Sequence, residues 1–510
     1  MGKLNQPEGP FGRAANRICA VTAAASAVEM AWQIRSALRE TRTIELRLDW
    51  LRSDTERTRL LNWLKRHKPR AATFLATCRS VAGGGKFRGD LQSELYWLIR
   101  AREAGCSWCD VEVETMRRLP DQSMREYAVP PKVLLSEHDF ARTPRLPKSV
   151  NPPAPGEADA VKIAAQARTI SDSLRLLRLA RRSRNFVAVP MGEVGLPARI
   201  LALREGSALA YAPVAIATAP GQISLSELKN LYRAHLLTPK TAVYGVIGEP
   251  IGHSLSPLLH NTGFVARHVD AVFLPFLVRD LGDFLKAVPE LGIRGFSVTI
   301  PHKQGILKHL DACEPIAAKM EAVNTVVVRR NGSLFGCNTD YLAVIRALGR
   351  KLTIPGSRIL IFGAGGSARS AAFALARAGA SASICSRREA AAKSLARAMG
   401  GEAVPRRALR TERFDAILNA TPVGMHPKVG VSPLAADELH CRIVMDFVYR
   451  PLHTELLRIA RKKGIATISG LEMFLAQGLA QWGLWTGRQP PERSMRRAVM
   501  AALRAEEKSR

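Results

Sequence analysis

Short apolar runs alternate with helical patterns along the first 236 residues of the chain. Eight of these runs have the length and composition of β-strands, and most are followed by a segment whose apolar positions recur at helical spacing. The runs cover residues 18–22, 43–50, 72–79, 108–114, 132–140, 158–164, 186–191 and 209–215. Eight strands alternating with helices predict a (β/α)8 TIM barrel, whose chemistry lies at the C-terminal ends of the strands.

The pattern changes after this region. Residues 224–237 are typical of one capped amphipathic helix, which Pro239 ends, and a second series of strands and helices follows. Within that series, the apolar run 358–362 leads through Gly363-Ala-Gly-Gly into an Ala-rich helix that ends at Gly379. A strand, a glycine turn and a helix N-terminus in this order favour a Rossmann-type domain that binds a dinucleotide pyrophosphate.

The residues after the next strand bear on the choice of dinucleotide. The apolar run 382–385 ends where an NAD enzyme places a carboxylate for the ribose hydroxyls, but the chain continues with Ser386-Arg387-Arg388. Two guanidinium groups without a carboxylate favour a 2′-phosphate and therefore NADP(H). The alternative is an ordinary strand-to-helix corner with solvated arginines.

Composition narrows the class of protein. A chain of 510 residues suggests two or three domains. The net charge of +31 favours anionic partners, but the basic residues are spread along the chain, and no zinc-finger or RRM signature predicts specific binding to nucleic acid. No apolar stretch reaches the ~18 residues of a membrane span.

Cysteine usage and the N-terminus bear on the compartment. The eight cysteines lie mostly in apolar runs, as in a reduced cytoplasmic protein, while the acid-poor residues 1–17 leave a plastid location open. The pair Cys106 and Cys109 lacks the two further ligands that zinc needs, so no metal site is predicted.

Lys162 is the most informative polar residue of the predicted barrel. Flanked by Val161 and Ile163, it is expected to point inward and lose hydration, which lowers its pKa and leaves a neutral amine able to attack a ketone. His138, at the end of the preceding strand, is placed to remove the proton that the resulting iminium acidifies. The alternatives are a lysine paired with a carboxylate and a histidine held by a hydrogen bond. The polar residues at the strand ends are Glu45, Arg47, Asp49, Arg79, Asp110, Glu112, His138, Lys162 and Arg199.

A second group of polar residues precedes the glycine turn. Lys303 and Asp340 each follow an apolar run, and a lysine and an aspartate that meet in one pocket can share a proton near neutral pH, as the reduction of a ketone requires. A surface lysine and a turn aspartate are the alternatives. The neighbouring loops contain Ser254, Ser256, Thr299, Asn324 and Thr339.

A series of motifs gives the first half a family resemblance. ELRLD, TCR, DVE, SEHDF followed by Thr-Pro, ADAVKIA, MGEVGLPAR and TAPGQI occur in this order, and together they resemble type I 3-dehydroquinate dehydratase over nearly all of residues 17–237. The resemblance implies that Lys162 forms a Schiff base and that His138 is the general acid and base. It also implies a set of substrate-binding residues, namely Glu45, Arg47, Arg79, Glu112, Arg199, Thr218 and Gln222.

Three positions depart from that family. Gly83 stands where the family usually has a glutamate near the histidine, and Thr218 stands where it has a serine. Residues 143–155 contain five prolines where the family has a crossover helix, and because proline denies helix N–H groups we expect an extended or irregular crossover there.

The second half resembles shikimate dehydrogenase from residue 242 to about residue 500, through GHSLSP, GFSVTIPHK, AVNT, GCNTD, GAGGSAR, NATPVGM, DFVYRPLHT and GLEMFLAQ. The resemblance makes Lys303 and Asp340 the catalytic pair. The implied substrate-binding residues are Ser254, Ser256, Thr299, Asn324, Tyr449 and Gln477. The implied NADP-binding residues are Gly363, Ala364, Gly365, Gly366, Ser367, Ser386, Arg387, Arg388 and Gly470. Ser297 replaces the usual asparagine and Glu321 the usual glycine, so the preference for shikimate over quinate is open.

Taken together, the two resemblances predict a bifunctional enzyme, because the product of the dehydratase is the substrate of the dehydrogenase. The predicted order is an N-terminal tail (1–16), the barrel (17–237), a substrate-binding domain (242–340), a Rossmann NADP domain (341–475) and a C-terminal helical segment (476–510). The predicted partners are 3-dehydroquinate, 3-dehydroshikimate and shikimate, with no specific nucleic acid and no membrane. The alternatives are a dehydrogenase with an inactive barrel and a non-catalytic metabolite sensor; the retained Lys162, His138, Lys303 and Asp340 argue against the sensor.

Overall fold

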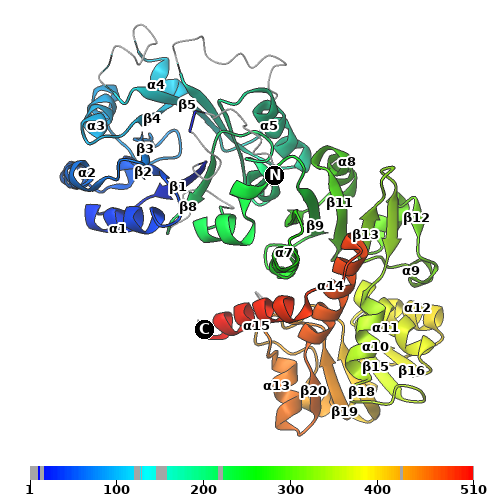
Figure 1. Cartoon of the computed structure of the whole chain (residues 1–510). Helices are drawn as coiled ribbons and strands as arrows, with labels where there is room; N and C mark the ends of the chain where they lie inside the picture. The colour runs from blue at the N-terminus through cyan, green and yellow to red at the C-terminus, as the bar shows by residue number, and fades with distance from the viewer. Residues whose placement is uncertain are drawn as a thin grey trace. The chain divides into compact units, whose positions relative to one another are not determined.

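The computed structural model describes residues 10–11, 17–119, 127, 129–144, 158–215, 222–425 and 429–508 (Figure 1). The chain forms two compact units, one of residues 1–241 with 282–287 and one of residues 242–281 with 288–510. Each unit is described by itself.

The first unit contains an eight-stranded parallel sheet. Its strands follow the order β7-β6-β5-β4-β3-β2-β1-β8, so that β8 returns to pair with β1. On the far side, the Ala208 N–H donates to the Phe186 carbonyl (2.7 Å), which joins the start of β8 to β7. The strands are β1 (Ile18–Thr22), β2 (Thr43–Arg47), β3 (Thr73–Thr77), β4 (Trp108–Glu112), β5 (Lys132–Asp139), β6 (Ala160–Gln166), β7 (Phe186–Met191) and β8 (Ala210–Pro213). The predicted (β/α)8 barrel is confirmed.

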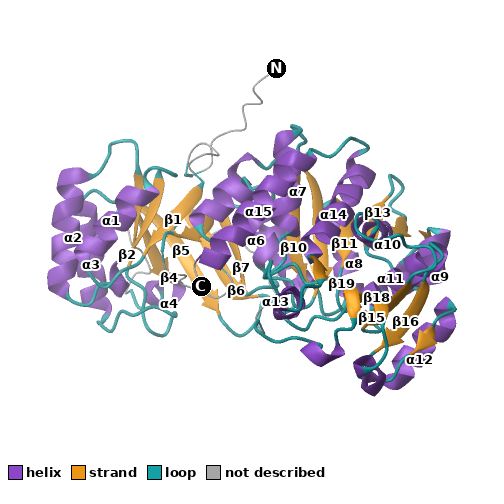
Figure 2. Ribbon diagram, turned by 90° about the horizontal axis from the view of Figure 1, so that it is seen from below, coloured by secondary structure: helices purple, strands orange, loops and turns teal. Residues whose placement is uncertain are grey.

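Helices cover the outside of this barrel, as Figure 2 shows for α1, α2 and α3 beside β1 and β2. Apolar side chains on the strands and just before them form a core; it contains Phe11, Cys19, Leu75, Trp108, Leu134, Ala160, Val187, Ala208 and Leu209. Polar side chains predominate toward the C-terminal strand ends, which is where a barrel of this type carries its site. The helices of this unit are α1 (Ala27–Ala37), α2 (Asp54–His67), α3 (Leu91–Glu103), α4 (Val113–Met116), α5 (Ile170–Arg182) and α6 (Leu196–Leu201).

The single helix expected over residues 224–237 is wrong. Instead a π-helical turn covers Glu227–Leu231, a 3-10 turn covers Ala234–Leu236, and Arg233 between them has a left-handed backbone (φ 51°). Burial explains the break: Leu228, Tyr232 and Ala234 are all buried, and one face of a straight α-helix cannot hold positions four and then two residues apart. The irregular crossover expected at 143–155 falls mostly on residues outside the described ones, as does Thr218.

The second unit contains two six-stranded sheets. The first follows the order β10-β9-β11-β13-β14-β12, with β9, β10 and β11 parallel and with β13 antiparallel to β11 and β14. Its elements are β9 (Ala242–Gly248), α7 (Ser256–Ala266), β10 (Ala271–Leu277), β11 (Ile293–Val298), β12 (Ala312–Cys313), α9 (Pro315–Met320), β13 (Thr325–Val328) and β14 (Leu334–Cys337). Helix α8 (Leu281–Leu291) follows β10 along the chain, and its residues 282–287 belong to the first unit. We call this part the substrate lobe.

The other sheet is parallel throughout and follows the order β17-β16-β15-β18-β19-β20. Its elements are α10 (Asp340–Leu348), β15 (Arg358–Phe362), α11 (Gly366–Arg377), β16 (Ser381–Cys385), α12 (Glu389–Met399), β17 (Glu402–Ala403), β18 (Phe414–Asn419), β19 (Cys441–Asp446), α13 (Glu455–Lys462) and β20 (Ala466–Ile468). Helices α14 (Gly470–Thr486) and α15 (Glu492–Lys508) complete the chain. We call the parallel sheet and its helices the nucleotide lobe.

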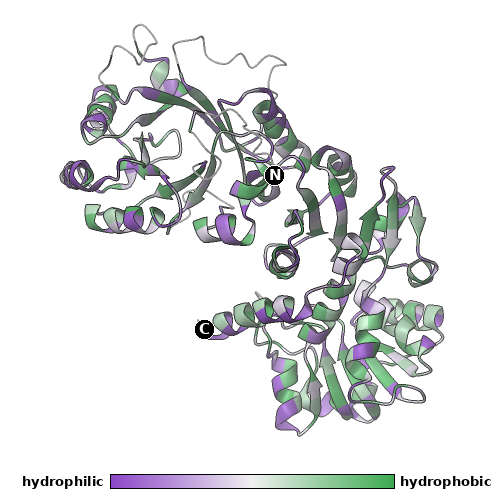
Figure 3. Ribbon diagram, viewed as in Figure 1, coloured by the Kyte–Doolittle hydropathy of each residue, from purple (hydrophilic) through white to green (hydrophobic). Residues whose placement is uncertain are grey.

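Two apolar cores hold the nucleotide lobe together. One lies between the sheet and α10, α11 and α12, and the other between its opposite face and α13. Figure 3 shows the hydrophobic colour concentrated on the strands that these cores share. Strand order reverses between β15 and β18, and ligands of doubly wound sheets bind at the carboxyl ends of the strands at such a point. The predicted Rossmann-type fold is confirmed.

Candidate active sites

Lys162 lies inside the barrel, on β6 between β5 and β7. It is 4% exposed, and its ammonium forms an ion pair with Asp110 at the middle of β4. Its Nζ also lies 5.0 Å from the ring centre of Tyr211 on β8. The inward direction predicted from Val161 and Ile163 is therefore present, and so is the carboxylate partner that we considered as the alternative.

Asp110 is the centre of the polar network. Its Oδ2 accepts from Lys162 and lies 2.9 Å from Arg79 Nη2, while its Oδ1 accepts from Ser136 Oγ (2.6 Å). Burial alone would raise the pKa of Asp110, but the charges of Arg79 and Lys162 outweigh burial and hold this pKa well below its usual range. The sequence placed Asp110 among the strand-end polar residues without assigning it a role.

The same charges act on the two predicted catalytic groups. Burial lowers the pKa of Lys162, Asp110 opposes that shift, and Arg79 adds to it, so that the net direction is downward. Burial, together with Arg79 and Lys162, lowers the pKa of His138 far below its ordinary value. Arg79 Nη1 lies 2.6 Å from both imidazole nitrogens of His138 and can donate only to the unprotonated one, which requires a neutral ring. The site therefore holds His138 as a neutral imidazole, with Arg79 against its acceptor nitrogen.

Three of the other predicted substrate residues of the barrel, Glu45, Arg47 and Arg199, are buried. Glu45 accepts from Thr77 Oγ1 (2.7 Å), and Arg47 makes two hydrogen bonds to Asp49 (2.9 and 2.8 Å). Arg199, on α6, is 9% exposed, and burial lowers its pKa to about 10. Gln222 is half-buried in the segment after β8.

Glu112 fills the space beside Gly83. A Cβ added at Gly83 would lie 1.4 Å from Glu112 Oε1, and Glu112 Oε2 accepts from the Ser80 N–H (3.0 Å). Glu112 is 4% exposed. A carboxylate is thus present next to the position where the family glutamate would begin, although it comes from β4.

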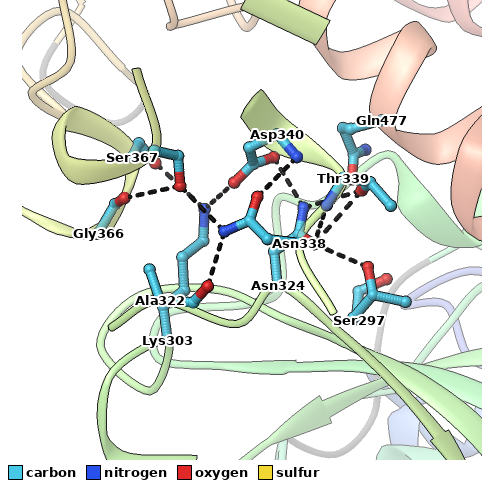
Figure 4. A network of polar contacts seen from close by, with 12 residues as sticks. Ser297, Lys303, Ala322, Asn324, Asn338, Thr339, Asp340, Gly366, Ser367 and Gln477 are labelled. Atoms are coloured by element: carbon cyan, nitrogen blue, oxygen red, sulfur yellow. Dashed lines mark hydrogen bonds and ion pairs between the residues drawn. The ribbon is translucent and has the colours of Figure 1, made fainter. Parts of the chain in front are cut away.

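Lys303 and Asp340 meet in the second unit. Lys303 Nζ donates to Asp340 Oδ2 (2.6 Å) and to Ser367 Oγ (3.1 Å), and the side chains of Lys303 and Asp340 are 12% and 6% exposed. Asn324 Nδ2 donates to Asp340 Oδ1 (2.8 Å), so both carboxylate oxygens are held (Figure 4). Lys303 follows β11 and Asp340 begins α10, so the fold brings together two residues that are 37 positions apart.

Most of the predicted substrate residues of this unit lie near one another at the ends of elements. Ser256 is the first residue of α7, and Ser254 Oγ accepts from its N–H (3.2 Å). Tyr449 stacks on Phe474 (4.3 Å between ring centres); burial raises the pKa of Tyr449, and hydrogen bonding to Leu255 and Ser254 opposes that rise. The remaining members are Thr299, half-buried after β11, and Gln477, whose amide donates to the Phe474 carbonyl (2.9 Å).

Gln481 is a residue that sequence reasoning missed. It is 1% exposed on α14, accepts from Ser297 Oγ (2.9 Å) and donates to Thr325 Oγ1 (3.0 Å) and to the Asn324 carbonyl (3.3 Å). Ser297, which replaces the usual asparagine, is therefore tied to α14. A polar residue at helical spacing from Gln477 was the only signal available in the sequence.

The residues of the glycine turn fit a dinucleotide. Gly363 has φ 130°, and a Cβ there would lie 3.1 Å from Ala420, whereas a Cβ at Gly365 would meet nothing within 4 Å. Gly365 is the N-cap of α11 and supplies no side chain, so backbone N–H groups and the positive end of the helix dipole face the turn. Ala364 and Ser367 complete the turn.

The adenosine side of that site fits a phosphate as well. Arg387 and Arg388 are exposed directly after β16, and Ser386 Oγ donates to the Arg388 carbonyl (2.7 Å). These groups would hold a 2′-phosphate. Gly470 is the first residue of α14. A Cβ there would lie 2.5 Å from the Phe447 carbonyl oxygen and would keep α14 from approaching that backbone closely.

Two features are absent from the described part of the chain. No group of three or more His, Cys, Asp or Glu side chains among them is arranged to hold a metal ion. No helix in the described ranges combines the length and the apolar character needed to cross a membrane.

Comparison with known families covers both units. The chain matches the profile of type I 3-dehydroquinase over residues 18–237, that of the shikimate dehydrogenase substrate binding domain over residues 246–326, and that of the shikimate 5'-dehydrogenase C-terminal domain over residues 470–500.

Individual relatives agree with these matches. Shikimate dehydrogenase (NADP(+)) of Moorella thermoacetica is 41% identical over 280 residues, which cover 52% of this chain and 95% of that protein. A shikimate 5-dehydrogenase of Thermus thermophilus, solved in complex with NADP(H) and shikimate, is 35% identical with a TM-score of 0.48, over 51% of this chain and 100% of that one. The chloroplastic bifunctional 3-dehydroquinate dehydratase/shikimate dehydrogenase of Arabidopsis thaliana is 33% identical over 474 residues, which cover 88% of this chain and 78% of that protein. With one relative spanning both units in the same order, the chain belongs to the bifunctional 3-dehydroquinate dehydratase/shikimate dehydrogenase family.

Proposed function

We propose that the chain catalyses two consecutive reactions, the dehydration of 3-dehydroquinate to 3-dehydroshikimate and the NADPH-dependent reduction of 3-dehydroshikimate to shikimate. Membership of the bifunctional family supports the pair of reactions. The observation that carries the first reaction is the buried Lys162 amine on the strand next to His138. The two predicted activities need no metal.

In the barrel, the neutral amine of Lys162 adds to the C3 ketone and releases water, which leaves an iminium. The neutral imidazole of His138 then removes a C2 proton, and the electron pair moves into the iminium. As the pair returns, the C1 hydroxyl leaves with the proton from His138 as a second water. Hydrolysis of the product iminium consumes one water and restores Lys162, so the net change is the loss of one water.

The charged neighbours have separate tasks in this scheme. Asp110 holds the amine of Lys162 in place, because the two share a hydrogen bond. Arg47 and Arg199 supply guanidinium groups for the substrate carboxylate, and Glu45 and Gln222 supply acceptors and donors for its hydroxyls. We propose these roles from the position of each residue around the network.

A chain with an inactive barrel is the second candidate, and Gly83 is the observation that favours it. Without the family glutamate, the only carboxylate shown beside that position is Glu112. Borohydride trapping in the presence of 3-dehydroquinate separates the two candidates, because reduction of the imine leaves a stable adduct on Lys162. We expect the adduct in the parent and its absence in Lys162→Ala.

In the second unit, Lys303 and Asp340 hold the ketone oxygen and supply its proton. Asp340 is fixed by Asn324, and Lys303 donates to Asp340, so a proton can pass from the ammonium to the developing alkoxide while the carboxylate keeps the lysine oriented. Bound NADPH supplies the hydride. Gly363–Ser367 would hold its pyrophosphate and Arg387 and Arg388 its 2′-phosphate.

The test is incubation of the purified chain with 3-dehydroquinate and NADPH, following dehydroshikimate absorbance and NADPH loss. Lys162→Ala should abolish the first step, and Lys303→Ala should mainly abolish the second, because each removes the amine of one site only. The exposed lysines Lys132 and Lys308, each outside these networks, provide matched controls. If Lys162→Ala and Lys303→Ala behave like the parent, the assignment of both sites is wrong.

The proposed compartment is the cytoplasm. A plastid is the alternative, because the Arabidopsis relative is named as a chloroplastic protein. Fractionation of cells that express the full chain with a C-terminal tag distinguishes the two.

A further inference from the structure

The first turns of α11 contact the substrate lobe through three side chains. Ser367 Oγ accepts from Lys303 Nζ (3.1 Å), and Ser370 Oγ accepts from Asn338 Nδ2 (3.0 Å). Arg369 Nη1 lies 3.0 Å from Glu321 Oε2. These three residues lie in the first turns of α11, directly after the glycine turn. The glycine turn, which would hold the cofactor, is therefore attached to the lobe that would hold the substrate.

Asn338 connects this attachment to the proton-transfer pair. Its Nδ2 also donates to the Ala322 carbonyl (2.8 Å), and its Oδ1 accepts from the N–H of Asp340 (2.9 Å). Ser370 Oγ in turn donates to the Gly366 carbonyl (3.1 Å). Figure 4 shows Asn338 between Ala322 and Asp340, with Lys303 and Gly366 both on its left. The contacts therefore form a continuous path from the glycine turn to Asp340.

Glu321 is the unusual member of the attachment. It has a left-handed backbone (φ 47°) at the C-terminal end of α9, a conformation that favours glycine. A charged residue there carries a backbone cost that glycine avoids. The side chain of Glu321 reaches across to Arg369, which is only 14% exposed and is thereby fixed against the substrate lobe.

We propose that Glu321 and Arg369 are positioning residues of the dehydrogenase, whose ion pair sets the glycine turn in register with Lys303 and Asp340. The proposal rests on the proposed reduction and adds to it two residues that touch neither ligand. A misplacement of about 1 Å between reacting groups can lower a rate by about 10²-fold. An ion pair one helical turn from the cofactor-binding backbone is placed to control that distance.

Two features of the geometry make the pair suitable for this task. A Cβ added at Gly366 would lie 3.1 Å from Lys303 Cβ and Cδ, so the turn and the lysine are already in close contact and a small rotation of α11 must move both. Val323, two residues after Glu321, donates its N–H to the Lys303 carbonyl (2.9 Å). Displacement of the 321–323 segment therefore reaches the backbone of the catalytic lysine.

The first test needs no cofactor. Amide hydrogen exchange is measured on the full chain in the parent, Glu321→Gln, Arg369→Gln and the double variant. We expect faster exchange in residues 321–328 and 366–371 of each single variant, and no further increase in the double variant, because either change already breaks the pair. Glu438→Gln removes one partner of the Arg406–Glu438 pair, which lies within the nucleotide lobe, and is the matched control.

The second test measures the reaction. Each single variant should lower kcat for the NADPH-dependent reduction about three- to tenfold and raise the primary isotope effect with deuterated NADPH, with the double variant no lower. Because Glu321 is 63% exposed, salt should screen the ion pair. Raising NaCl from about 0.05 to 0.5 M should therefore lower kcat of the parent toward that of Glu321→Gln and leave kcat of that variant unchanged. Arg369→Lys, which keeps the charge, should restore part of kcat, whereas Glu321→Gly should behave like Glu321→Gln even though it relieves the backbone.

The dehydratase activity belongs to the other compact unit of the same polypeptide and should be unchanged in each variant. Exchange and kcat equal to those of the parent in both single variants would overturn the proposal. If Glu438→Gln slows the reduction as much as Arg369→Gln, the effect is general and the proposal is also wrong. Absence of reductase activity in the parent would instead refute the proposed function, while the exchange measurement would still decide whether the pair fixes α11.

Discussion

Replacing Asp110 by asparagine should move the pH dependence of the dehydratase toward acid. The change keeps the shape of the side chain and removes the one carboxylate that pairs with both Lys162 and Arg79. Since Asp110 is the strongest influence that raises the pKa of Lys162, its loss leaves burial and Arg79 to lower that pKa further. A lower pKa means that the amine becomes neutral, and able to attack the ketone, at a lower pH.

The size of the shift follows from the strength of the ion pair. Two unit charges about 4 Å apart interact by about 4 kcal/mol at an effective dielectric constant of ~20, which corresponds to about three pKa units. Relaxation around the new amide reduces this value, so we expect a shift of about one to three pH units. Leaving Lys162 and Arg79 without their partner should also destabilise the barrel by about 3 to 5 kcal/mol at a pH where Lys162 is charged.

The assay is kcat/KM for dehydration as a function of pH, which reports groups of the free enzyme. Burial lowers the pKa of both Lys162 and His138, and Asp110 opposes that shift in each, so loss of Asp110 should move the ascending limb toward acid whichever of the two groups sets it. Asp159→Asn is the matched control, because Asp159 accepts from the Val133 N–H (2.9 Å) outside the network. An ascending limb that stays in place, or moves toward alkali, would refute the reasoning.

Three further outcomes are expected. Burial raises the pKa of Glu94 to about 7, so the contribution of this carboxyl to stability is present at low pH and is lost as the pH rises through 7. Glu94→Gln should therefore stabilise the barrel at pH 8 by up to about 3 kcal/mol and change its free energy of unfolding little at pH 4. Urea unfolding at the two pH values measures both effects. Ser297→Ala leaves the buried amide oxygen of Gln481 without its donor and should destabilise the second unit by about 1 to 3 kcal/mol, whereas Ser297→Thr, which keeps the hydroxyl, should cost less if the methyl group is accommodated. Replacing either Arg387 or Arg388 by alanine should lower kcat/KM for NADPH about 10- to 100-fold and leave that for NADH nearly unchanged, because a charge-assisted hydrogen bond to a phosphate contributes about 1.5 to 3 kcal/mol; equal losses with both cofactors would exclude a 2′-phosphate site.

Local pattern determined where the barrel strands lie. The expected runs 18–22 and 186–191 coincide with β1 and β7, because a buried parallel strand is a short apolar run bounded by polar turns and this signal needs no distant partner. The glycine turn after residue 362 was equally predictable from the sequence, because its chemistry is confined to a few consecutive residues. Periodicity failed at 224–237, where the burial of Tyr232 and Ala234 in the folded chain decides the backbone.

The sequence by itself determined which residues bring chemistry, because an amine between two apolar neighbours or a row of glycines is visible locally. Only the tertiary structure decided what those residues face. Asp110 reaches Lys162 across 52 positions, and Ser297 reaches Gln481 across 184. Such pairs depend on which elements are neighbours and on the register in which strands pair, and local sequence patterns do not specify either. The Glu321–Arg369 pair is the same case: Glu321 alone was an unexplained departure, and its partner became visible only when α11 was placed against α9.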